Sequence, residues 1–343
     1  MQKPNKHVSL ILRLAVAVGA LAWVLGKQEW GELAAAFGNL ELGAFGTGLL
    51  VFALTQVVLP FRWWLLLRAQ RVHLPLLVAV RLHFLGLFFN NLMPSSVGGD
   101  FLRAWYVTKH TEKRFEAALS VFVDRAVGLS GIILMALAAY FSLSRELSLY
   151  HISQSSQDNG SARGPGAQIV GYVCLTVLLL VTLVLLNGRS RGLLARQWAG
   201  KRDYLASLAV KARRVGVVYC QRPWTVFLTL CLTLFLQAST IVALWVLGRS
   251  IGIEAHLKYY FVIFPVMWVI AALPVSIAGI GILEGGIAVL FVSLAGATRE
   301  EATCLALCQR LIWILTSLPG VAIHLYGGHL PKSFSFDPHP QAE

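Results

Sequence analysis

Long hydrophobic runs separated by short polar segments recur along the chain. Six of these runs are long enough for a helix to cross about 30 Å of hydrocarbon, which takes roughly 20 residues. They cover residues 8–25, 43–67, 115–143, 167–187, 224–248 and 303–326. Aromatic residues lie near their ends, where a spanning helix meets the lipid headgroups. The pattern predicts an all-α integral membrane protein with six full crossings.

Two further hydrophobic runs, 76–93 and 259–273, end differently. Each stops at a proline, Pro94 or Pro274, and then continues through Ser and Gly to a carboxylate. Proline removes a backbone donor and disfavours helix in the residue before it, while glycine permits irregular dihedral angles. We therefore expect two re-entrant segments, broken within the membrane, which brings the number of membrane helices to about eight.

The two prolines lie half a chain apart, as in transporters built from two related halves with discontinuous helices at the binding site. This spacing predicts an inverted repeat with halves of roughly 1–165 and 166–330. Both halves would form a single membrane domain, 1–330, followed by a short cytoplasmic tail, 331–343. The polar connection that starts at residue 144 is expected to be a flexible external loop.

The composition supports a membrane location: 57% of the residues are hydrophobic and 13% are charged. The net charge is +13, but no basic face with interleaved aromatic residues lies outside the predicted crossings. We therefore expect no nucleic-acid binding. With the predicted crossings, 19 Lys and Arg residues fall on one side and 6 on the other. Because cytoplasmic segments are the more basic ones, both termini should be cytoplasmic. The basic segment 188–223 should lie on anionic lipid headgroups.

Charged residues within hydrophobic segments are costly and need partners or a wet cavity, so they are the candidate site. Together with the Ser and Gly residues of the two breaks, the predicted substrate-binding residues are Asn91, Ser96, Gly98, Gly99, Asp100, Arg103, Asp124, Arg125, Ser276, Gly279, Gly281, Glu284 and Arg310. The arginines and the backbone amides suit a phosphate group. The alternative is that Asp100 with Arg103, and Asp124 with a neighbouring arginine, are ion pairs that only hold helices together.

The sequence gives little support for metal binding, cofactor binding or catalysis. The five cysteines form no CxxC pair, and we expect no metal, no other cofactor and no catalytic residue. No nucleotide-binding or hydrolase motif is present.

The motif Asn90 to Asp100 with Arg103, the pair Asp124-Arg125, and Gly279-Ile280-Gly281 followed by Glu284 resemble the transmembrane (flippase-like) region of the lysylphosphatidylglycerol synthase family. The resemblance covers nearly the whole chain. It implies a bacterial or archaeal plasma-membrane protein related to the part of those synthases that moves aminoacylated phospholipid between leaflets. Because the sequence ends at Glu343 without a soluble transferase region, the lipid need not carry lysine.

Three functions follow as hypotheses. The first is a translocase for a phospholipid or polyprenyl-phosphate lipid, with Arg103, Arg125 and Arg310 binding phosphate. The second is a membrane-embedded transferase that uses Asp100 or Glu284 as general base. The third is an accessory subunit without transport, and an oligomer is compatible with all three.

Overall fold

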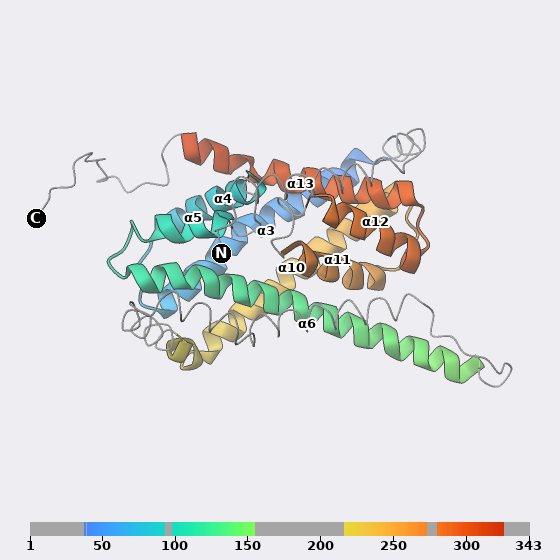
Figure 1. Ribbon diagram of the computed structural model, residues 1–343, viewed down its shortest axis with the longest axis horizontal. Helices are drawn as coiled ribbons and strands as arrows, with labels where there is room; N and C mark the ends of the chain where they lie inside the picture. Colours follow the sequence, from blue (N-terminus) through green and yellow to red (C-terminus); the bar gives the residue numbers. More distant parts are fainter. Residues whose placement is uncertain (1–37, 39, 93–97, 155–215, 273–279, 326–343) are drawn as a thin grey trace, which may run out of the picture.

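The described part of the computed structural model is helical and contains no strand. It comprises residue 38 and residues 40–92, 98–154, 216–272 and 280–325. Figure 1 shows its helices packed side by side along the long axis of the molecule. They are α3 (Leu42–Ala69), α4 (Leu76–Leu92), α5 (Gly98–Val107), α6 (Arg114–Gln154), α10 (Pro223–Ile251), α11 (Leu257–Ala272), α12 (Ile282–Ala295) and α13 (Arg299–Leu325). The predicted all-α class is confirmed.

Four helices, α3, α6, α10 and α13, are long and apolar enough to cross a membrane. The 28 residues of α3 extend over about 42 Å, more than the thickness of the hydrocarbon core. Four of the six predicted crossings are therefore confirmed as helices of spanning length. The other two, 8–25 and 167–187, lie outside the described residues.

One expectation about the first half was wrong. We expected a loop from Ser144, but α6 continues to Gln154. The stretch from Ser144 to Gln154 contains no Pro or Gly, and Arg145, Glu146 and Leu147 are good helix formers, so nothing in it stops the helix.

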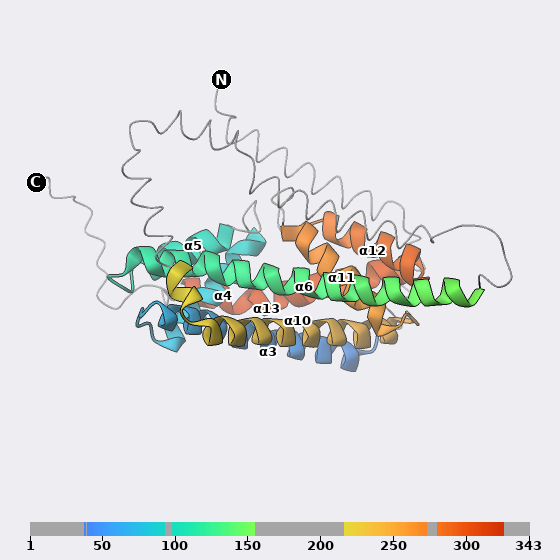
Figure 2. The same ribbon diagram turned by 90° about the horizontal axis from the view of Figure 1, so that it is seen from below.

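The two broken segments each give a pair of short helices, α4 with α5 and α11 with α12. In Figure 1, α4 and α5 lie together in the half of the molecule where α3 ends and α6 begins, and α11 and α12 lie in the opposite half. The turned view in Figure 2 shows the same separation. Helices α3 and α10 pack against each other and run along the molecule in opposite directions.

The contacts between helices in one half are repeated in the other half. If α3, α4, α5 and α6 are exchanged for α10, α11, α12 and α13, every close helix contact maps onto another close contact. For example, α4 packs against α13 as α11 packs against α6, and α3 with α10 maps onto itself. The two halves therefore have the same internal packing.

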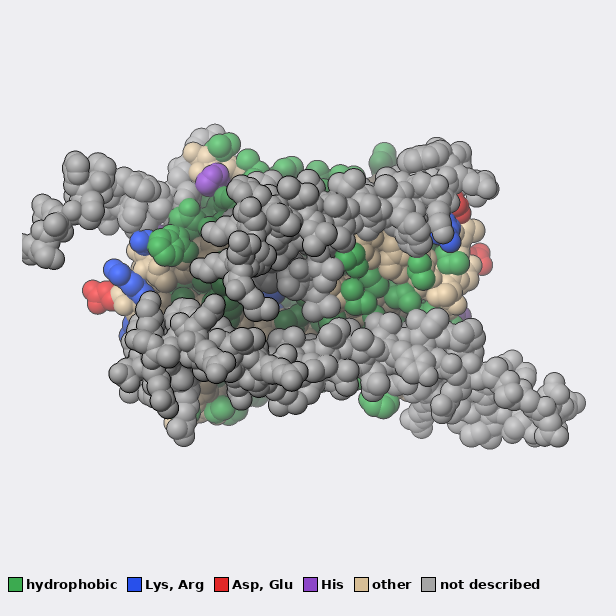
Figure 3. Space-filling model, viewed as in Figure 1, with side chains coloured by type: hydrophobic (Ala, Val, Ile, Leu, Met, Phe, Trp, Pro, Cys, Tyr) green, Lys and Arg blue, Asp and Glu red, His purple; other side chains and the backbone are tan. Residues whose placement is uncertain are grey.

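Three buried hydrophobic clusters, one of them small, hold the described helices together. In the first half, Trp63, Leu82 and Val121 bring α3, α4 and α6 together. A larger cluster holds α10, α11, α12 and α13 together and includes Ile241 and Phe264. Figure 3 shows hydrophobic side chains along the middle of one face and charged side chains toward its two ends, as expected of a protein embedded in lipid.

Close packing of α4 against α5 depends on Gly99. A methyl group at this position would overlap the carbonyl oxygen of Gly86, and the two backbones touch here. We predict that Gly99→Ala lowers the melting temperature of the purified protein by several degrees, because rigid backbone atoms would have to move. Gly46→Ala is the matched control, since a methyl group there meets nothing within 4 Å. Equal melting temperatures for the two variants would contradict the prediction.

Candidate functional site: a polar cavity between the two halves

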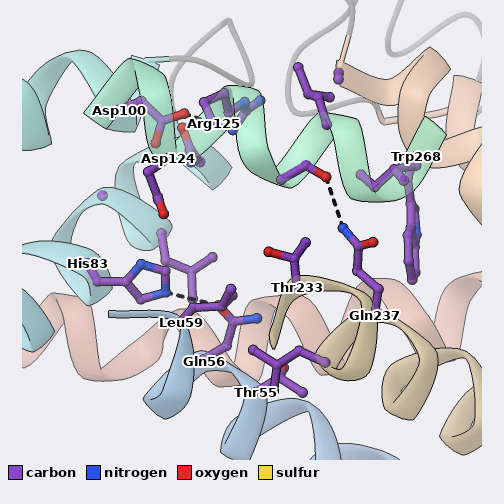
Figure 4. A pocket seen from close by; sticks show the side chains of 18 of the residues that line it. Thr55, Gln56, Leu59, His83, Asp100, Asp124, Arg125, Thr233, Gln237 and Trp268 are labelled. Carbon is purple, nitrogen blue, oxygen red and sulfur yellow. Dashed lines mark hydrogen bonds and ion pairs between the residues drawn. The ribbon is translucent and has the colours of Figure 1, made fainter. Parts of the chain in front are cut away.

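A cavity of about 360 Å³ lies among α3, α4, α5, α6, α10, α11 and α13. Much of its wall is apolar and includes Phe52, Leu59, Leu129, Ile132 and Leu236. The polar residues of the wall come mainly from the first half and from α10. Figure 4 shows them around one space, with His83, Asp100, Asp124 and Arg125 at one end and Gln237 and Trp268 at the other.

Asp124 is the centre of the charged end. Its two carboxylate oxygens accept hydrogen bonds from Arg62 Nε at 2.9 Å and from Arg103 Nη1 at 3.2 Å. The side chains of all three residues are less than 10% exposed. Arg62 also donates to Thr233 Oγ1 at 2.8 Å and to the Asp124 carbonyl at 3.2 Å. Its guanidinium thus ties α3 to α6 and α10, which is a structural task.

Arg103 differs from Arg62 because its hydrogen-bonding capacity is only partly used. Its guanidinium lies over the ring of Trp63, with Cζ 3.7 Å from the ring centroid. Nε and Nη2 are buried and have no hydrogen-bond partner. Stacking on Trp63 and one bond to Asp124 hold the group in place at the cavity wall, while Nε and Nη2 stay without a hydrogen-bond partner.

Asp100 does not pair with Arg103, as the alternative of buried ion pairs supposed. Its Oδ2 accepts from Arg125 Nη1 at 2.7 Å, while Arg103 bonds to Asp124. One helical turn separates Asp100 from Arg103 along α5, but their side chains bond to different residues of α6. Sequence spacing alone does not reveal this crossed pairing.

The other end of the cavity is polar and uncharged. Gln237 donates to the Gly128 carbonyl at 3.1 Å, and its Oε1 is buried without a hydrogen bond. Trp268 Nε1 is also buried without a partner. Nearer the charged end, His83 Nε2 lies 3.1 Å from Gln56 Oε1, so the imidazole is already hydrogen-bonded. One acceptor, Gln237 Oε1, and one donor, Trp268 Nε1, are therefore buried without a hydrogen bond at the neutral end.

Glu284 and Arg310 form a separate ion pair and are not part of the cavity wall. Arg310 Nε donates to Glu284 Oε1 at 2.6 Å, and Glu284 Oε2 accepts from the Gly281 amide at 2.7 Å. Glu284 therefore caps α12, the helix that begins after the second break. The cavity does not bring Gly281, Glu284 and Arg310 together with the other predicted residues.

The two ion pairs occupy equivalent places in the two halves. Asp100 and Glu284 lie in the first turns of α5 and α12. Arg125 and Arg310, their partners, are both the twelfth residues of α6 and α13. Asp124, however, is matched by Gln309, which is 1% exposed and has no hydrogen bond from its amide group. Among the residues that the structure describes, the charged centre therefore lies in the first half alone.

The equivalent place in the second half is nearly closed. Gln309 borders a void of about 10 Å³, which shares Phe52, Thr240 and Trp313 with the large cavity. The exchange of halves thus relates an open charged site to a closed neutral one.

The remaining predicted residues have varied positions. Asn91 lies in the cavity wall and has a buried amide nitrogen without a partner. The amide of Gly99 is already donated to Asn90 Oδ1 at 2.8 Å, and neither Gly98 nor Gly99 belongs to the wall. Ser96, Ser276 and Gly279 lie outside the described residues.

Three residues important to the cavity were absent from the predicted set: Arg62, Gln237 and Trp268. Arg62 is buried and lines the cavity, as the predicted residue Arg103 does. A signal for Gln237 exists in the repeat, because Gln56 and Gln237 are both the fifteenth residues of α3 and α10. Both line the cavity.

The sequences of α6 and α13 carry a further trace of this repeat. Both helices begin with Arg, have Glu-Ala at the third and fourth positions, and have Arg at the twelfth. Ala117 and Ala302, the fourth residues, are both fully buried. This shared pattern, if recognised, would have aligned the two halves directly.

Comparison with protein families identifies the chain. The model of the lysylphosphatidylglycerol synthase TM region matches residues 10–320. The chain belongs to this family. It is a multi-pass membrane protein, and the match covers every helix that lines the cavity except the last residues of α13. Comparison with curated proteins gave no match.

The family of the lysylphosphatidylglycerol synthase membrane region is named for a synthase, but the matched region is the membrane part alone. In the parts of the chain that the structure describes, no three His, Cys, Asp or Glu side chains are grouped as a metal site requires. The chemistry that the described residues of the cavity offer is hydrogen bonding and charge: arginine and amide side chains in a half-open space whose walls are largely apolar.

Proposed function

We propose that this member of the family is a lipid translocase of a bacterial or archaeal plasma membrane. A phosphate-bearing headgroup enters the cavity while the acyl chains stay in the bilayer. The observation that carries the proposal is Arg103, whose Nε and Nη2 lack partners at the wall of a 360 Å³ cavity. An arginine fork of this kind matches the geometry of phosphate oxygens.

The arrangement of the helices supports a translocation path. We propose that α4 with α5 and α11 with α12 are re-entrant hairpins that enter from opposite sides, which makes the chain an inverted repeat. In such a repeat, one half rocks against the other around a central site. The closed void beside Gln309 is then the place that opens when the charged cavity closes.

The charges at the ends of the helices support one orientation in the membrane. Basic residues gather at the end of the molecule where α3 ends and where α6 and α10 begin: Arg68, Arg71, Lys109, Lys113, Arg114 and Arg222. The opposite end carries Glu41, Glu254, Glu300 and Glu301 beside Arg249, Lys258 and Arg299. We assign the basic end to the cytoplasm.

Filling the cavity tests the proposal. A side chain at Gly128 enters the cavity, since its first carbon atom lies 3.6 Å from Arg62 Nη1 and meets no backbone. We expect Gly128→Phe to reduce the transfer of a fluorescent phospholipid between leaflets of proteoliposomes at least about tenfold, because the ring occupies the headgroup's place. The matched control is Gly46→Phe, in open space on an exposed part of α3, which should transport normally.

Other outcomes separate the alternatives. Transport by folded Gly128→Phe at the rate of the unmodified protein would contradict a path through this cavity. Conversion of labelled lipid into a new product by the purified protein would indicate a transferase. Transport that appears only after a second protein is added would indicate an accessory subunit.

A further inference from the structure

We propose that Trp313, stacked on Phe52, is the gate between the charged cavity and the void beside Gln309. The gate is closed in this structure. It opens when a headgroup moves from the charged cavity toward the second half of the molecule. The inference rests on the proposed function, because it names the residues that control passage along the same path.

The two rings lie between the two hollow spaces. Phe52 and Trp313 belong to the wall of the large cavity and also to the wall of the small void beside Gln309. Their ring centroids are 6.2 Å apart and their planes are inclined by 26°, so the rings are stacked. Both side chains are half-buried, whereas a ring that only fills a core has neighbours on every side. The stacked pair therefore separates one space from the other.

The exchange of halves shows what the rings replace. Trp313 is the fifteenth residue of α13, and the fifteenth residue of α6 is Gly128. Phe52 is the eleventh residue of α3, and the eleventh residue of α10 is Thr233. Gly128 and Thr233 both line the large cavity. Two aromatic rings thus stand in the second half where the first half has a glycine and a short hydroxyl side chain.

The rest of the void's wall fits the same exchange. Gln309 corresponds to Asp124, and Ala243 corresponds to Arg62, since both are the twenty-first residues of their helices. Ala243 and Gln309 border the void as Arg62 and Asp124 border the cavity. The void of about 10 Å³ is therefore the counterpart of the space around the charged centre, narrowed by the two rings. Separation of the rings enlarges it into a second, uncharged position for a headgroup.

Trp313 is also connected to α12. Arg310 precedes it by one helical turn, and its Cζ lies 5.6 Å from the centroid of the Trp313 ring. The same guanidinium donates to Glu284, which caps α12. A movement of α12 that shifts Arg310 therefore also displaces the ring. This contact gives a rocking second half a direct means to open the gate.

Removing the ring tests the gate by transport. We expect Trp313→Ala to speed the transfer of a fluorescent phospholipid in proteoliposomes at least about threefold, because the headgroup no longer waits for two rings to separate. A structural role alone would slow transfer instead. Trp313→Phe keeps a ring and should give a smaller increase. If Trp313→Ala does not fold, Trp313→Leu replaces it, since it removes the ring and keeps an apolar side chain.

Trp224→Ala is the matched control. Trp224 also stacks on a phenylalanine, Phe227, with ring centroids 5.6 Å apart. It is 73% exposed near the start of α10 and lines neither space. Its loss removes the same kind of ring contact away from the path, so lipid transfer should remain normal.

The access of a thiol reagent to the void tests the gate without transport. Gln309→Cys is introduced into a chain whose five native cysteines are replaced by Ala, and the purified protein is treated with a charged, water-soluble thiol reagent. We expect slow labelling with the ring present, and labelling at least about tenfold faster when Trp313→Ala is added, because the closed state no longer blocks the void. Adding Trp224→Ala instead should leave labelling slow. Equal labelling with and without the Trp313 ring would overturn the proposal.

The failure of this inference is distinguishable from the failure of the proposed function. If Gly128→Phe blocks lipid transfer but folded Trp313→Ala transfers lipid at an unchanged or lower rate, the path through the cavity stands and the gate is wrong. If Trp313→Ala speeds labelling of Gln309→Cys but Gly128→Phe does not alter transfer, the rings close the void and the proposed function fails.

Discussion

Asp124→Asn is expected to destabilise the protein by about 3 kcal/mol, the scale for removing one partner from a buried ion pair. Asp124 accepts from Arg62 and Arg103, and all three side chains are buried. The amide side chain cannot neutralise either guanidinium, so the positive charge of the cavity wall rises. The measurement is unfolding of the purified protein in a detergent series, compared with the unmodified chain.

Glu112→Gln is the matched control for this variant. It also removes one carboxylate charge near the start of α6, but Glu112 is exposed, and the stability should change by less than about 0.5 kcal/mol. If Asp124→Asn and Glu112→Gln unfold at the same point of the detergent series, the Arg62–Asp124–Arg103 cluster does not hold the helices together. The loss of stability should shrink when Arg103→Met is added to Asp124→Asn. The double variant has one buried arginine fewer that lacks a carboxylate partner.

Arg103→Ala is expected to lower lipid transfer in proteoliposomes about 10- to 100-fold while the protein stays folded. The lost hydrogen bonds to a charged phosphate are worth about 1.5–3 kcal/mol, and each 1.4 kcal/mol corresponds to a factor of ten. Folding should survive because Asp124 keeps Arg62 as its partner. Arg103→Lys should recover only part of the activity, since an ammonium group cannot form the planar fork that lies over Trp63.

Arg68→Ala is the control for Arg103→Ala. Arg68 also lies over a tryptophan, with Cζ 4.2 Å from the Trp64 ring centroid, but it is exposed at the end of α3. Its loss removes the same kind of stacking contact without touching the cavity, and lipid transfer should remain normal. Equal transfer by Arg103→Ala and the unmodified protein would remove Arg103 from headgroup binding.

The breaks in the helices were predictable, but their use of polar groups was not. Pro94 and Pro274 mark the ends of two hydrophobic runs, and the structure ends α4 at Leu92 and α11 at Ala272, just before them. The glycines after the first break were predicted to offer amides to phosphate. Instead, Gly99 allows close contact with Gly86 and gives its amide to Asn90. Sequence spacing cannot distinguish these roles, because both require a small residue with a free dihedral angle.

The membrane location, the all-α class, the spanning helices within the described residues and the two breaks follow from the sequence by itself. These properties depend on local facts: the length of hydrophobic runs and the backbone limits of Pro and Gly. The sequence also predicts a polar site, because charged side chains within hydrophobic segments need partners. Its predicted members include Asp100, Arg103, Asp124 and Arg125.

Only the tertiary structure decided which charged residues meet. Arg62 donates to Asp124, which lies 62 residues away in the sequence. Asp100 pairs with Arg125 and not with Arg103, and Arg310 pairs with Glu284. The pairing depends on how α3, α5 and α6 approach one another in space, and several arginines are equally suitable partners by charge alone. The same packing places a charged cavity in one half and a closed neutral void beside Gln309 in the other.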